Sequence, residues 1–81
     1  MLLKVIREKE IAYYNCQQIK EIIISHLYED DGRYDVGLDM YNGIEPIRVF
    51  ASQEDAEEFV ARLADSLAKL DNGSVIDCQK I

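Results

Sequence analysis

The chain has 81 residues, of which 48% are hydrophobic, and its 16 acidic and 9 basic residues give a formal net charge of −7. The length predicts one small domain spanning residues 1–81, and the apolar share argues against disorder. The charge argues against a nucleic-acid binder, because such proteins must neutralise phosphates, and against attachment to an anionic membrane.

The location and the redox state follow from short segments of the chain. The apolar run that begins at Met1 is too short for a signal peptide, and no segment approaches the ~20 apolar residues of a membrane span. We therefore expect a cytoplasmic protein without a membrane anchor. Cys16 and Cys78 are expected to be reduced thiols, although a disulfide is possible if the last segment pairs beside Cys16.

The first part of the chain is expected to form strands. Residues 2–8 and 11–15 predict a hairpin, and residues 15–18 predict a turn or bulge. Ile19–Tyr28 is apolar on both faces, which indicates a strand that is covered twice or that has its second face at an interface. A helix is the competing interpretation of Ile19–Tyr28, but three consecutive isoleucines favour the strand.

A second hairpin is predicted further along. Asp31-Gly32 suits a tight turn, Tyr34–Tyr41 alternates strictly, and Asn42-Gly43 signals a hairpin that returns through Ile47–Phe50. Pro46 cannot donate to a strand ladder, so it should lie at an edge or before pairing begins. The alternation places Tyr34, Val36, Leu38 and Met40 toward the core, and Asp35, Gly37, Asp39 and Tyr41 toward water.

An amphipathic helix follows over Ser52–Leu70. Ser52 is the expected N-cap, Asp55 occupies the capping-box position, and Asn72-Gly73 ends the helix. Ser74–Lys80 is expected to form a last strand with Ile76 and Cys78 facing inward. The apolar side chains of the helix fall on one narrow stripe, formed by Ala56, Phe59, Val60, Leu63, Leu67 and Leu70.

The order of elements is therefore β-β-β-β-β-α-β, and it predicts an α+β fold. We expect a bent antiparallel sheet or roll with one amphipathic helix packed across one face, because every link between strands is short enough for a hairpin.

No sequence motif indicates catalysis or a cofactor. The chain has no glycine-rich phosphate loop, nucleophile elbow or HExxH, so we expect neither an enzyme nor a cofactor site. The carboxylates near Asp31 do not match a calcium loop, and the cysteines have no zinc-ligand spacing, so no metal site is expected. A thiol- or metal-dependent enzyme would require Cys16, Cys78 and His26 to cluster in one cleft.

The outer face of the second hairpin is the predicted partner-binding surface. Asp31, Asp35 and Asp39 are acidic, and Tyr41 shares their face, a composition that suits a basic protein partner. A solvated hairpin with ordinary cross-strand packing is the alternative.

A homodimer is also predicted. Ala61, Ala64 and Ala68 form a smooth shoulder on the helix, and Ile23 lies on the second apolar face of its strand; a wide core contact would explain the alanines equally well. The leading hypothesis is a small acidic interaction module that self-associates. The alternative is an acidic inhibitor that mimics nucleic acid, which would need its carboxylates in one continuous band.

Overall fold

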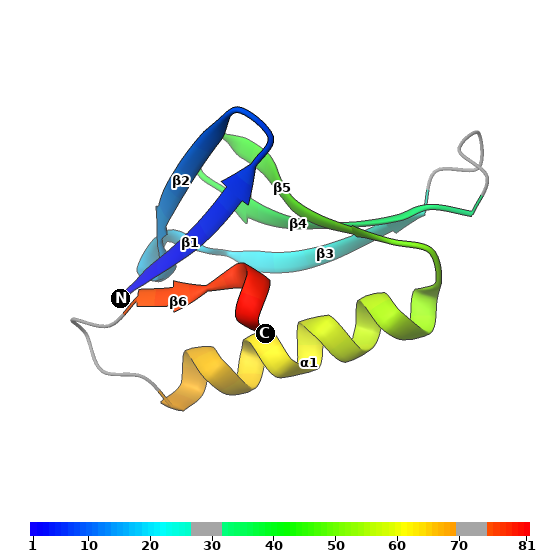
Figure 1. Ribbon diagram of the computed structural model, residues 1–81. Helices are drawn as coiled ribbons and strands as arrows, with labels where there is room; N and C mark the ends of the chain where they lie inside the picture. Colours follow the sequence, from blue (N-terminus) through cyan, green and yellow to red (C-terminus); the bar gives the residue numbers. More distant parts are fainter. Residues whose placement is uncertain (27–31, 70–74) are drawn as a thin grey trace.

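The computed structural model describes residues 1–26, 32–69 and 75–81, and it confirms the α+β class and the predicted order of elements (Figure 1). The strands form two three-stranded sheets and the helix packs against the second. The elements are β1 (Leu2–Arg7), β2 (Glu10–Asn15), the 3-10 turn η1 (Cys16–Gln18), β3 (Glu21–His26), β4 (Tyr34–Met40), β5 (Gly43–Phe50), α1 (Gln53–Lys69), β6 (Val75–Asp77) and the 3-10 turn η2 (Cys78–Lys80).

The first sheet has the order β2-β1-β6. β1 and β2 form the expected antiparallel hairpin, but β6 runs parallel to β1, with Val75 opposite Leu2. The helix carries the chain back across the molecule, so β6 enters beside the start of β1 rather than through a hairpin (Figure 1). A parallel pair requires this kind of long crossover.

The second sheet has the antiparallel order β3-β4-β5, and β3 is a strand, as predicted. Val36 and Leu38 are fully buried, as the alternation of β4 predicts. Gly37 was expected to face water but is also buried, because the Ile44 side chain lies over it. The register shifts in β5: Arg48 lies opposite Val36 and Pro46 opposite Gly37, so Ile47 is an extra residue without a partner in the register. This bulge turns Ile47 into the core in an edge strand that also contains Pro46, the position that proline tolerates.

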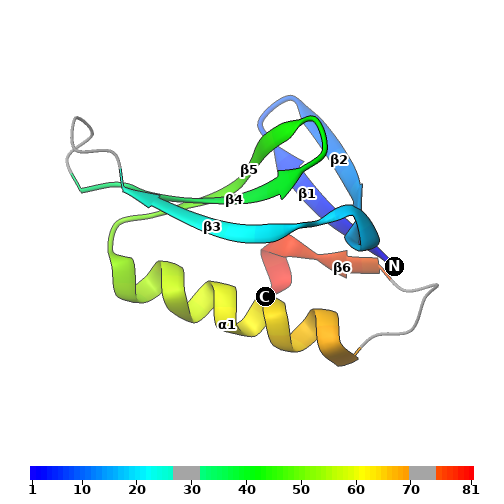
Figure 2. The ribbon, with the colours of Figure 1, turned by 180° about the vertical axis from the view of Figure 1, so that it is seen from behind.

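The core lies where the inner faces of the two sheets meet the helix. α1 crosses the inner face of β3–β4–β5 (Figure 2), and Ser52 caps it by accepting the Asp55 N–H at 3.2 Å. The outer faces of both sheets are not covered by any described element. The buried side chains are Leu3, Val5, Val36, Leu38, Ile47, Ala56, Phe59, Leu63, Ile76 and Cys78.

Some expected features lie outside the described residues: the acidic turn at 29–31, Leu70 and the helix end at 72–73. Within the described part of the chain, no helix combines the length and the apolar character needed to cross a membrane.

Candidate interaction surfaces

The outer face of the second sheet brings several predicted site residues together. The register places Ile23 beside Gly37, with Asp35 and Asp39 on either side of Gly37 along β4. We call this surface the acidic sheet face; its members are Glu21, Ile23, Ser25, Asp35, Gly37, Asp39, Ile44, Pro46 and Val49.

The two aspartates of the acidic sheet face are held differently. The Asp35 side chain is 26% exposed, and its Oδ1 lies 3.2 Å from the Arg33 Nε in an ion pair that lacks hydrogen-bond geometry. Asp39 is half-buried, and its backbone carbonyl accepts the Lys20 N–H at 2.8 Å. Tyr41 is 75% exposed at the end of β4, with the Lys20 Nζ 4.6 Å from its ring centroid. The remaining predicted residue, Asp31, lies outside the described residues.

The structure adds apolar residues that the sequence did not single out. Ile44 and Val49 are 59% and 52% exposed on the acidic sheet face. Ile44 lies over Gly37, where an added Cβ would come within 2.8 Å of the Ile44 Cγ2. A regular alternation along β5 would have predicted which of its side chains face outward. The bulge after Pro46 shifts this alternation by one residue, so the sequence pattern does not assign Ile44 and Val49 to the same face.

The predicted dimer contacts are not brought together. Ala61, Ala64 and Ala68 are exposed on α1, which covers the inner face of the second sheet. Ile23 lies on the outer face of the same sheet, so these residues belong to two separate surfaces.

A polar network joins the ends of the two hairpins. The Arg7 guanidinium donates to the Pro46 carbonyl and contacts Glu10, both at 3.0 Å, and it also donates to the Tyr14 hydroxyl. The Tyr14 hydroxyl in turn donates to the Glu45 Oε2 at 3.4 Å. The hydrogen bond to Tyr14 raises the pKa of Arg7. Through Pro46 and Glu45, the network connects the first hairpin to β5.

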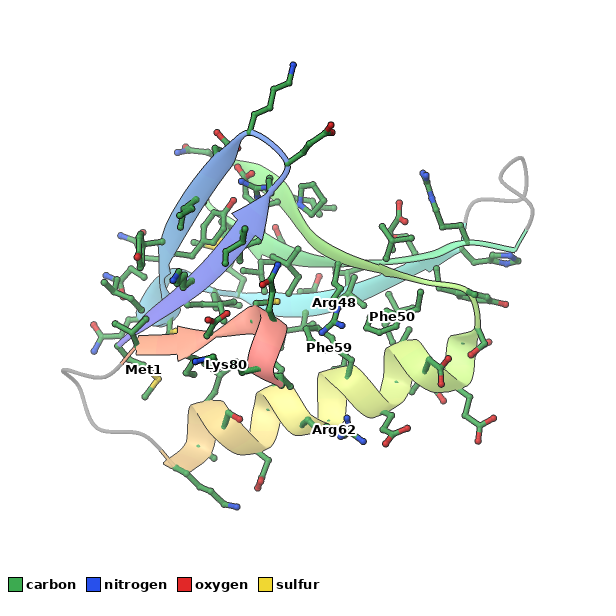
Figure 3. The ribbon with its side chains drawn as sticks, in the orientation of Figure 1. Met1, Arg48, Phe50, Phe59, Arg62 and Lys80 are labelled. Carbon is green, nitrogen blue, oxygen red and sulfur yellow. The ribbon has the colours of Figure 1, made fainter. Side chains whose placement is uncertain are left out.

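A groove of about 140 Å³ lies between β5, α1 and Ile81, and Figure 3 labels four of its lining residues, Arg48, Phe50, Phe59 and Arg62. Arg48 lies over the rings of Phe50 and Phe59, at 5.3 and 5.2 Å from their centroids, and donates to the Cys78 carbonyl at 3.4 Å. The second arginine of the groove, Arg62, forms an ion pair with Glu58. Both arginines are therefore engaged within the protein, and Arg48 connects the Cys78 carbonyl at the start of η2 to the Phe59 ring of α1.

The structure keeps the cysteines and the histidine apart. Cys16 follows β2 and Cys78 follows β6, which lie on opposite sides of β1 and four residue rows apart, about 13 Å along the strand. The last segment therefore does not pair beside Cys16, and both cysteines are free thiols. His26 stacks on Tyr34 at the far end of β3, with ring centroids 4.3 Å apart. No group of three metal-ligating side chains occurs within residues 1–26, 32–69 and 75–81.

Burial should protect both thiols from alkylation. It raises the pKa of Cys16, which is half-buried beside Met1, and that of the buried Cys78, so little reactive thiolate forms near neutral pH. At about pH 8, we expect iodoacetamide to modify Cys16 first and Cys78 at least about tenfold more slowly, whereas both react rapidly in urea. Mass spectrometry of the native and unfolded chain measures this order. A Cys78 that reacts equally fast in both states would contradict its burial.

The raised thiol pKa values also determine whether the free energy of unfolding rises or falls with pH. The folded state disfavours the thiolates, so the protonated thiols contribute to the free energy of unfolding. This contribution is complete below the thiol pKa of the unfolded chain, about 8.5, and is lost as the pH rises through the higher thiol pKa values of the folded protein. The free energy of unfolding should therefore fall in this alkaline range, and Cys78→Ala should reduce that fall.

The fold and these surfaces define a small α+β protein with an exposed apolar surface on each of its two sheets. Comparison of the chain with protein-family models, curated proteins and solved structures gives no match.

Proposed function

We propose that this protein is a small interaction module that docks a basic protein partner on the acidic sheet face. The observation that supports the proposal is the placement of Asp35 and Asp39 on the central strand, with the exposed Ile44 and Val49 on the adjacent strand. Carboxylates provide electrostatic complementarity to a basic surface, and the apolar side chains provide area to bury.

Rigidity supports the same proposal. The carboxylate of Asp35 is partly buried, and both aspartates project from the middle strand of a hydrogen-bonded sheet. A partner would therefore meet charges that are already positioned, which lowers the entropic cost of binding. The exposed Tyr41 follows directly after β4, two residues beyond Asp39, and its ring suits the centre or rim of an interface.

The alternative, an acidic inhibitor that mimics nucleic acid, has less support. Its carboxylates should form one band, yet described acidic residues lie on surfaces as different as the acidic sheet face and the helix. Glu54, Asp55, Glu57 and Glu58 are exposed on α1, which covers the other side of the second sheet. This distribution favours a local docking surface over a phosphate-like track.

The proposal also includes a cytoplasmic location and association of the chain with a second copy of itself. Two free thiols are typical of a reducing compartment. The exposed apolar side chains are divided between both sheets, which leaves a surface for a second copy besides the acidic sheet face. The alanine shoulder of α1 is a further candidate contact, since Ala61, Ala64 and Ala68 are exposed.

Charge reversal on the acidic sheet face tests the docking proposal. Asp35→Lys/Asp39→Lys should abolish recovery of basic partners in affinity capture, because lysines repel a basic surface. Asp39→Lys alone, which leaves the Arg33–Asp35 ion pair intact, should reduce recovery at least about tenfold. Quantitative mass spectrometry of the captured proteins gives the readout.

The matched control is Glu8→Lys/Glu57→Lys, which changes the net charge equally at exposed positions outside the acidic sheet face. It should recover the same partners as the unmodified chain. Unchanged recovery by the folded Asp35→Lys/Asp39→Lys variant would remove the acidic sheet face as the docking surface.

A further inference from the structure

β2 is an open edge of the first sheet. It is the end strand of the order β2-β1-β6, and its extensive contacts within the described residues are with β1 alone. In Figure 2, β2 lies on the outside of the molecule. A strand in this position presents a row of unpaired N–H and C=O groups that can template another strand.

The register identifies which backbone groups point outward. The Cys16 N–H donates to the Met1 carbonyl at 3.1 Å, so in an antiparallel ladder Tyr14, Ala12 and Glu10 also direct their backbone groups toward β1. The N–H and C=O groups of Ile11 and Tyr13 therefore point away from β1. No backbone hydrogen bond to these outward groups is found among the described residues.

Two of the other sheet edges carry features that oppose strand addition. β5 contains Pro46 and a bulge, and β6 has only three residues. The third, β3, has Glu21, the half-buried Ile23 and Ser25 on its outer face, so pairing there would bury little apolar surface. By contrast, β2 pairs with β1 over six consecutive residues without a bulge, and it contains no proline.

The side chains beside this edge include large apolar groups that are exposed to solvent. Ile11 and Tyr13 are 56% and 54% exposed on the outer face of the first sheet. The same face also carries the exposed apolar side chains of Leu2, Ile6 and Val75, with Lys4 and Asp77 in the row opposite Tyr13. Cross-strand pairs of aromatic and β-branched residues stabilise a sheet, so a second strand beside β2 would bury both side chains favourably.

From this edge we propose that two copies of the chain pair antiparallel through β2, forming one continuous six-stranded sheet. This inference specifies the self-association included in the proposed function. An antiparallel edge is complementary to itself around a two-fold axis. A two-fold axis at Ala12 places Ile11 opposite Tyr13 of the second copy and aligns their outward backbone groups.

Charge favours a second copy at this edge. Each chain carries a net charge of −7, so two copies meet most easily where charge is sparse. Glu10 is the only charged residue in β2. In the register centred on Ala12, Glu10 faces Tyr14 of the second copy, so the two carboxylates are not opposed. Added salt should therefore strengthen the dimer by screening the net repulsion.

Light scattering across a concentration series tests the proposal. The unmodified chain should approach twice the 9.3 kDa monomer mass as its concentration rises. Ile11→Lys should raise the dimer dissociation constant at least about tenfold, because a lysine at a strand edge disfavours pairing. The matched control is Val49→Lys, which adds the same charge at a similarly exposed β-branched residue of the acidic sheet face and should leave the mass unchanged.

Amide exchange then identifies the interface. At concentrations that give the dimer, the Ile11 and Tyr13 amides should gain protection, whereas in Ile11→Lys the Tyr13 amide should not. Tyr13→Pro removes one outward N–H without breaking a bond to β1, so it should give a folded monomer.

A chain that remains 9.3 kDa at all concentrations, or an Ile11→Lys variant that dimerises normally, would overturn strand pairing through β2. Neither result bears on partner docking, which Asp35→Lys/Asp39→Lys tests separately. A dimer lost in Val49→Lys but retained in Ile11→Lys would instead place self-association on the acidic sheet face.

Discussion

Leu38→Ala is expected to lower the free energy of unfolding by about 2–5 kcal/mol. Leu38 is fully buried on the inner face of β4, the central strand of the second sheet. It lies between Ile22 of β3 and Glu45 of β5, and hydrogen-bonded neighbours on both sides limit collapse of the resulting cavity. A chain of this length is expected to have a total stability of about 4–12 kcal/mol, so the loss is a large fraction of it.

Equilibrium urea unfolding measures this effect as a lower midpoint with an unchanged slope. The control is Ile44→Ala in the same sheet, where a 59% exposed side chain on the outer face is shortened instead. We expect that change to cost less than about 1 kcal/mol. Equal losses for the two variants would show that the inner and outer faces of the sheet had been assigned incorrectly.

Phe59→Ala is expected to cost about 3–5 kcal/mol and to weaken the docking of α1. Phe59 is 3% exposed, and its ring packs against Phe50 with centroids 5.2 Å apart. It also forms one face of the site that holds Arg48, which lies over the Phe50 ring as well and donates to the Cys78 carbonyl. Removing this ring therefore loosens the contacts among the helix, β5 and η2.

Urea unfolding gives the size of the loss, and the rate of Cys78 alkylation shows whether η2 has loosened. Phe59→Leu retains most of the buried volume and should cost less than about 1.5 kcal/mol. Glu57→Ala, at an exposed position on the same helix, should leave stability within about 0.5 kcal/mol. A Phe59→Ala variant as stable as Glu57→Ala would contradict the burial of the ring.

Local patterns were sufficient where a single face of one element meets the core. The alternation of Tyr34–Met40 predicts the burial of Val36 and Leu38, although not that of Gly37, and the helical stripe predicts the burial of Phe59 and Leu63. The turn signal at Asn42-Gly43 also holds, since Gly43 adopts a φ of +120°. Each of these features depends on the chain within a few residues of itself.

The candidate surfaces could be predicted only in part. The sequence placed Asp35, Asp39 and Tyr41 outside the core, but the exposed Ile44 and Val49 depend on a bulge that no local pattern announces. Bulges form when the twist and register of two paired strands require an extra residue, so they are properties of the pair. Strand pairing is likewise a property of two strands, so the sequence did not indicate that Gly37 of β4 would lie between Ile23 of β3 and Pro46 of β5.

The sequence alone determined the order of the elements and the inward-facing side chains Val36, Leu38, Phe59 and Leu63, because hydrophobic periodicity and turn residues act locally. The predicted last strand, Ser74–Lys80, was only partly correct, because Cys78–Lys80 forms the 3-10 turn η2 after the short strand β6. Tertiary structure decided which strands became neighbours. It set β6 parallel to β1, kept Cys16 and Cys78 apart, and placed β2 at the end of its sheet, where β1 is its neighbour among the described strands. These outcomes depend on where the helix returns the chain and on which surfaces bury each other best, and both are properties of the whole folded molecule.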